Sequence, residues 1–144
     1  MGRHPRAAGA RVYRASGSRR SKRKQFRAPL GAQINGNGAF DAAFVGASSD
    51  GSRVFFETAE QLVAADTDSA KDLYERSTTS GVTETKLVSA GQINGNGSFP
   101  ASFRGTYGTQ VFFHTGEQLV PDDTDAQQDV YSRDGSTTTR VSAG

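Results

Sequence analysis

Short apolar segments separated by turn-forming residues make up the sequence from residue 33 to the end. The segments are rich in β-branched and aromatic residues, and Gly, Asp, Ser and Thr lie between them, which is typical of strands and tight turns. The pattern predicts an all-β fold with two groups of four short strands. The expected strands are 42–47, 53–58, 72–76 and 83–89 in the first group, and 101–106, 110–115, 129–133 and 137–142 in the second.

The second strand of each group has the same apolar core, Val-Phe-Phe, at 54–56 and at 111–113. A sheet with one solvated face alternates apolar and polar residues along its strands. These strands do not alternate, so we expect each sheet to be covered on both faces. That is the environment of a blade in a β-propeller.

The two groups belong to an internal repeat. Gln-Ile-Asn-Gly-Asn-Gly occurs at 33–38 and again at 92–97, and Glu-Gln-Leu-Val occurs at 60–63 and again at 117–120. Over the two best-matching segments, 24 of 37 aligned positions are identical. We therefore divide the chain into a tail (1–32), a first repeat (33–91) and a second repeat (92–144).

The first repeat carries the signature Ser48-x-Asp50-Gly51, followed by Val54-Phe55-Phe56 and Asp72-Leu73-Tyr74. This order resembles the TolB-like (WD-type) β-propeller repeat. The resemblance implies four-stranded antiparallel blades in a noncatalytic binding scaffold of a bacterial surface or secreted protein, outside the cytoplasm. It identifies no ligand. The second repeat departs from the signature, because Gly108-Thr109 replaces Asp50-Gly51.

Two repeats are too few for a closed propeller, which needs roughly four to eight blades. We expect the chain to be part of a longer array, or to self-associate through uncovered sheet faces and unpaired edge strands. The expected partners are a protein, a peptide or a glycan, together with further repeat units. No apolar run reaches the ~18 residues of a membrane-spanning helix.

The net charge of +2 conceals a strong asymmetry, since residues 1–28 hold ten Arg or Lys and no acid. We predict that this tail is disordered, because it has few apolar residues to offset the ordering entropy. No apolar segment of a signal peptide follows its charges. Its densest cluster could bind a polyanion or nucleic acid, although we favour a solvated tail. The cluster consists of Arg19, Arg20, Lys22, Arg23 and Lys24.

Each repeat also carries an acidic loop with the spacing Asp-x-Asp-x-x-x-Asp. The loops contain Asp66, Asp68 and Asp72, and Asp123, Asp125 and Asp129. The carboxylates suit calcium, but the EF-hand glycine and terminal glutamate are missing. We favour Asx turns that satisfy backbone N–H groups and no cofactor, with calcium binding by these loops as the alternative.

The sequence offers little material for catalysis. It has no cysteine and two histidines, and it lacks the common hydrolase, zinc-protease and nucleotide-binding motifs. The Asn-Gly-Asn-Gly segments lack the third glycine of a dinucleotide fingerprint, so we expect loops between blades. We therefore predict a nonenzymatic protein. The alternative is a piece of a propeller-bearing hydrolase or lyase whose active site lies elsewhere.

Overall fold

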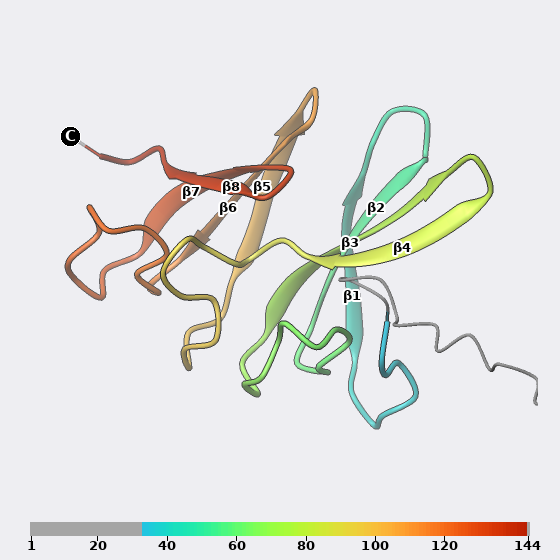
Figure 1. Ribbon diagram of the computed structural model, residues 1–144, viewed down its shortest axis with the longest axis horizontal. Coiled ribbons are helices and arrows are strands. Elements are labelled where there is room, and N and C mark those ends of the chain that lie inside the picture. Colours follow the sequence, from blue (N-terminus) through green and yellow to red (C-terminus); the bar gives the residue numbers. More distant parts are fainter. Residues whose placement is uncertain (1–32, 144) are drawn as a thin grey trace, which may run out of the picture.

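The chain forms two four-stranded antiparallel sheets that lie side by side, as Figure 1 shows for the computed structural model, which describes residues 33–143. In each sheet the strands follow one another in sequence order. The first sheet contains β1 (Ala42–Ala47), β2 (Arg53–Thr58), β3 (Asp72–Thr79) and β4 (Val82–Leu87). The second contains β5 (Ser102–Tyr107), β6 (Gln110–Thr115), β7 (Asp129–Asp134) and β8 (Thr137–Arg140).

The predicted all-β fold and the predicted number of strands are confirmed, with small differences at strand ends. β3 continues to Thr79 because the turn to β4 is made by Ser80 and Gly81 alone, with φ of 51° and 77°. Two consecutive residues with positive φ are characteristic of the hairpin turn that matches strand twist. The hairpin between β5 and β6 also forms, with Gly108 at a φ of 57°.

A register shift interrupts the first strand pair of each sheet at the same place. It falls between Phe44 and Gly46 in β1, and between Phe103 and Gly105 in β5. The extra residue is Val45 in the first repeat and Arg104 in the second. Such a bulge bends the strand and increases its twist.

The Val-Phe-Phe strands bury opposite faces in the two sheets. Phe55 and Phe113 are both fully buried, whereas Phe56 and Phe112 are half-buried. Phe112 is the repeat counterpart of Phe55, and Phe113 is the counterpart of Phe56. We call the face with Phe55 or Phe112 the inserting face, and the face with Phe56 or Phe113 the receiving face. The inserting face of the first sheet packs on the receiving face of the second.

One apolar cluster fills this junction between the repeats. The first repeat contributes Phe55, Leu73 and Val88, and the second contributes Ala101, Val111, Phe113, Leu119, Val120 and Tyr131. The rings of Phe55 and Phe103 stack across the junction with centroids 5.4 Å apart. Each fully buried large apolar side chain contributes about 1.5–3 kcal/mol relative to an exposed one. The junction is therefore a main source of stability for both sheets.

The repeated Asn-Gly-Asn-Gly segments form loops that bind a carboxylate of their own repeat. The N–H of Gly38 donates to Glu60 Oε1 at 2.7 Å, and the N–H of Gly97 donates to Glu117 Oε1 at 2.6 Å. A Cβ atom at Gly38 would lie 2.8 Å from the Glu60 oxygen, so glycine is required for this approach.

Candidate functional site

Polar contacts hold the edge of the second sheet against the first. Glu57 Oε1 accepts a hydrogen bond from the backbone N–H of Phe103 at 2.8 Å, and its Oε2 pairs with Lys71 Nζ at 2.6 Å. The carbonyl of Lys71 also accepts the N–H of Ala101 at 2.8 Å. These bonds satisfy two backbone donors next to β5 that would otherwise be unpaired at a sheet edge.

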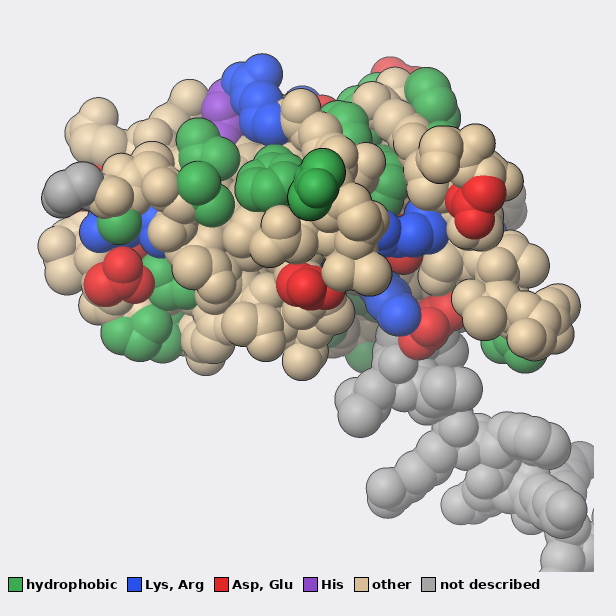
Figure 2. Space-filling view, turned by 90° about the horizontal axis from the view of Figure 1, so that it is seen from above, with side chains coloured by type: hydrophobic (Ala, Val, Ile, Leu, Met, Phe, Trp, Pro, Cys, Tyr) green, Lys and Arg blue, Asp and Glu red, His purple; other side chains and the backbone are tan. Residues whose placement is uncertain are grey.

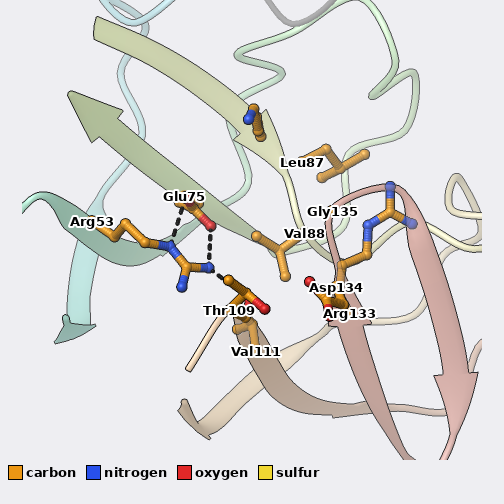
Figure 3. A pocket seen from close by; sticks show the side chains of 10 residues that line it. Arg53, Glu75, Leu87, Val88, Thr109, Val111, Arg133, Asp134 and Gly135 are labelled. Atoms are coloured by element: carbon orange, nitrogen blue, oxygen red, sulfur yellow. Dashed lines mark hydrogen bonds and ion pairs between the residues drawn. The ribbon is translucent and has the colours of Figure 1, made fainter. Parts of the chain in front are cut away.

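A groove of about 250 Å³ opens between the inserting face of the first sheet and the hairpins of the second (Figure 3). Arg53 pairs with Glu75 at 2.8 Å on one side of it, and donates to the carbonyls of Gly108 and Thr109 at 3.2 Å. The hydrogen bond to Glu75 raises the pKa of Arg53. Arg53 and Glu75 thus form an ion pair with each other within the junction.

The receiving face of the first sheet shares most of its apolar residues with the receiving face in the junction, and among residues 33–143 no sheet covers it. Phe44 is 70% exposed, whereas its counterpart Phe103 stacks on Phe55. A pocket of about 200 Å³ lies on this open face. Its lining includes Ala42, Phe56 and Leu62, whose counterparts in the second repeat are the junction residues Ala101, Phe113 and Leu119.

Polar groups on the open receiving face follow the same correspondence. In the junction, Arg133 Nη1 donates to the carbonyl of Ala90 at 2.7 Å. In the first repeat the counterpart Arg76 donates to the side-chain oxygen of Gln33, as does Thr85 at 3.2 Å. The amide oxygen of Gln33 takes the role that a neighbouring carbonyl has in the junction.

The inserting face of the second sheet is the other open face. It presents Phe112, Val130 and Val141 where the first repeat has Phe55, Leu73 and Val88. Val141 is 50% exposed, and its counterpart Val88 is buried in the junction. Figure 2 shows apolar side chains interspersed with charged ones on the surface of the molecule.

The polar residues of this second open face differ from those of the junction. His114 stands where the first repeat has Glu57, and its ring lies within 2.8 Å of Arg104 Nη2. Burial, and after it the charge of Arg104, lowers the pKa of His114. Gln110 replaces Arg53. The apolar part of the inserting face is kept, while its ionic contacts are not.

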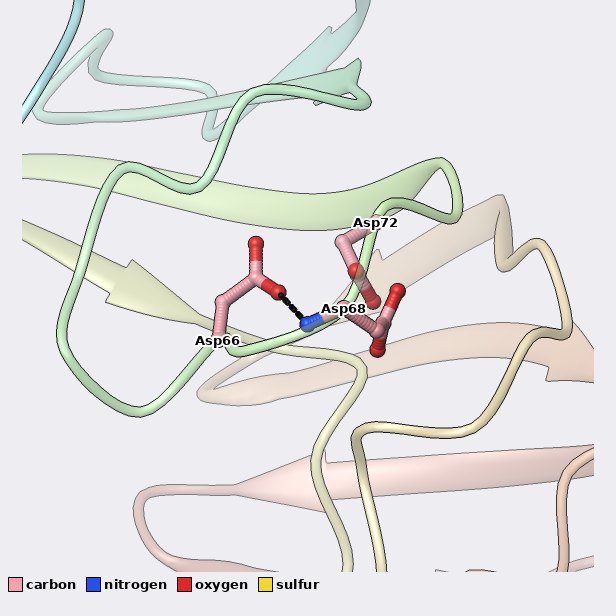
Figure 4. A group of neighbouring side chains, drawn as sticks. All are labelled: Asp66, Asp68 and Asp72. Atoms are coloured by element: carbon pink, nitrogen blue, oxygen red, sulfur yellow. Dashed lines mark hydrogen bonds between the residues drawn. The ribbon is translucent and has the colours of Figure 1, made fainter.

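Both acidic loops bring their three aspartates together, as the spacing predicts. In each loop, each of the three carboxylates has an oxygen that lies within 4.8 Å of an oxygen of the other two (Figure 4 shows the first loop). The predicted Asx turns are present: the N–H of Asp68 donates to Asp66 Oδ1 at 3.2 Å, and that of Ala70 to Asp68 Oδ1 at 2.6 Å.

The buried aspartates of the first loop also bind side chains of the sheet. Asp66 accepts a hydrogen bond from the hydroxyl of Tyr74, and Asp72 Oδ1 accepts one from Ser89 Oγ at 2.6 Å. Burial raises the pKa of Asp72 to about 7, and the neighbouring charges of Asp66, Asp68 and Glu117 add to this rise. These hydrogen bonds therefore fix the position of the loop relative to the sheet.

Three features of these sites are missing from the sequence analysis. They are the different exposure of Phe44 and Phe103, the bridging role of Glu57, and the position of the Arg140 side chain beside the second acidic loop. Alignment of the repeats would have drawn attention to Arg140, because Leu87 is its counterpart. The predicted basic cluster, Arg19 to Lys24, lies outside the described residues.

Comparisons with known proteins give no relative: no family model, no curated protein and no solved structure matches this sequence. Within 33–143, no helix has the length and hydropathy needed to cross a membrane.

Proposed function

We propose that this chain is a noncatalytic interaction module of β-propeller-like repeats, similar to the TolB-like type, which binds further repeats of the same kind. One observation carries the proposal. Phe44 is 70% exposed on a face whose counterpart in the second repeat is covered by a neighbouring sheet through Phe103. The open face thus carries most of the apolar residues of the covered face, and among residues 33–143 no sheet lies against it.

The occupant we propose is the inserting face of a second copy of this chain. That face offers Phe112, Val130 and Val141, which match the three apolar residues that the first repeat inserts into the junction. Contact between a receiving face and an inserting face is heterologous, so it leaves one open face at each end of a pair. Such contacts close into rings or continue as chains, according to the rotation between copies.

Contact between copies should be weaker than the junction within the chain. The junction has the hydrogen bond that the Phe103 N–H donates to Glu57, and the contacts of Arg53. The inserting face of the second repeat has His114 and Gln110 at those positions. Association between copies therefore depends mainly on apolar burial, and should rise with protein concentration.

Sedimentation of the full-length chain tests the proposal with two complementary variants. Phe44→Asp places a charge on the receiving face, and Phe112→Asp places one on the inserting face, so each variant alone should stay monomeric. A mixture of the two should form a one-to-one complex, because each variant retains the face that the other lacks. Val82→Asp is the control, since Val82 is exposed at the β3–β4 turn and belongs to neither open face.

The proposal fails if the wild type stays monomeric at millimolar concentration. It also fails if both variants keep their folded melting curves and the wild-type association, or if their mixture forms no complex.

A further inference from the structure

Two buried carboxylate oxygens in the first acidic loop have no hydrogen-bond partner. They are Asp68 Oδ2 and Asp72 Oδ2. Asp72 is only 3% exposed, and its carboxylate lies beside that of Asp68 in Figure 4. A buried carboxylate oxygen without a proton donor or a cation is unfavourable, because it has lost its hydration without compensation.

The second acidic loop has a cation at this place. Arg140 Nη1 lies 3.6 Å from Asp129 Oδ2 and 3.9 Å from Asp123 Oδ1, and Arg140 Nε lies 3.6 Å from Asp122. The guanidinium thus balances the charge of the carboxylates. The arginine comes from β8, where it pairs with Tyr131.

The first repeat has Leu87 at the position of Arg140. Leu87 pairs with Tyr74 in the sheet, just as Arg140 pairs with Tyr131, so the correspondence is structural as well as sequential. Among the residues that the structure describes, no Lys or Arg forms an ion pair with Asp66, Asp68 or Asp72. The nearest lysine in sequence, Lys71, pairs with Glu57.

The geometry points to a divalent-cation site of the calcium class at Asp66, Asp68 and Asp72, in the position that a guanidinium takes in the second repeat. All three supply carboxylate oxygens within 4.8 Å of one another. Calcium accepts six to eight oxygens in variable geometry, so loop carbonyls and water complete the shell. Weak calcium sites have dissociation constants on the order of 10⁻⁴ to 10⁻³ M, and we expect this site in that range. The predicted Asx turns are present in the same loop and use Asp66 Oδ1 and Asp68 Oδ1, which leaves Asp68 Oδ2 and Asp72 Oδ2 for a cation.

Calorimetric titration of the metal-free full-length chain with CaCl₂ at pH 8 tests the site. We expect one calcium per chain and an upward shift of the melting temperature. Asp68→Asn should weaken binding at least tenfold. Leu87→Arg supplies the guanidinium of the second repeat, so the folded variant should no longer bind calcium.

Two controls make the test specific. Asp125→Asn changes the matching position of the second loop and should leave calcium binding unchanged. Phe112→Asp, which lacks association under the proposed function, should also bind calcium like the wild type, so the two proposals are tested separately. The absence of binding at 10 mM calcium, or binding that folded Asp68→Asn and Leu87→Arg both retain, would overturn the site.

Discussion

At the scale of single residues, identical side chains at equivalent positions are buried to different extents in the two repeats. Phe56 and Phe113 occupy the same place in the Val-Phe-Phe strand, and each stacks on the tyrosine of the next strand with ring centroids 5.8 Å apart. Phe113 is fully buried in the junction, whereas Phe56 is half-buried on an open face. Their contributions to stability should differ accordingly.

We predict that Phe113→Ala lowers the free energy of unfolding by about 3–5 kcal/mol, because it leaves a cavity in the junction. Phe56→Ala should cost clearly less, since part of the ring is already in contact with solvent. Urea denaturation of both variants measures the difference. Equal losses would show that the two faces are covered to the same extent in solution.

At the scale of elements, the edge of the second sheet depends on one carboxylate of the first. Glu57 connects β2 to the backbone of β5 and to Lys71, although it is a charged residue with only 7% exposure. A buried charge is tolerated when it is paired and hydrogen-bonded, and both conditions hold here. The interaction has no equivalent in the second repeat, where His114 replaces the glutamate.

We expect Glu57→Ala to lower the free energy of unfolding by about 1–3 kcal/mol, because the Phe103 N–H loses its acceptor. Glu57→Gln keeps an acceptor oxygen and loses only the ion pair with the half-exposed Lys71, so it should cost under about 1 kcal/mol. Chemical denaturation at neutral pH compares the two. If both variants lost the same stability, the ion pair rather than the backbone contact would be the important interaction.

At the scale of the whole molecule, the two sheets share a single apolar cluster across the junction. Neither sheet can lose its partner without exposing Phe55, Leu73 and Val88 on one side, or Val111 and Leu119 on the other. This distinguishes the chain from two independent domains joined by a linker. Among residues 33–143, one apolar face of each sheet has no neighbouring sheet, which is the basis of the proposed association.

We therefore predict that the sheets unfold in one cooperative transition, with calorimetric and van't Hoff enthalpies that agree. Leu119→Ala, in the middle of the junction, should shift the whole transition to lower temperature by removing apolar contacts from both sheets. Differential scanning calorimetry at a concentration below that of association measures both. Two separate transitions in the wild type would show that the junction is too weak to couple the repeats.

The sequence alone determined the number, order and approximate ends of the strands, because these depend on local features such as apolar runs and turn residues. It also predicted that the three aspartates of each loop lie close together, since their spacing is local. It did not determine which phenylalanine of each pair is buried, because both faces of both sheets are apolar. The packing of the neighbouring sheet determines which phenylalanine is buried, and it also causes the different environments of Phe44 and Phe103. The importance of the difference between Leu87 and Arg140 likewise depends on the fold. The fold places each of these residues beside its acidic loop, and the effect of a charge depends on the groups near it in space.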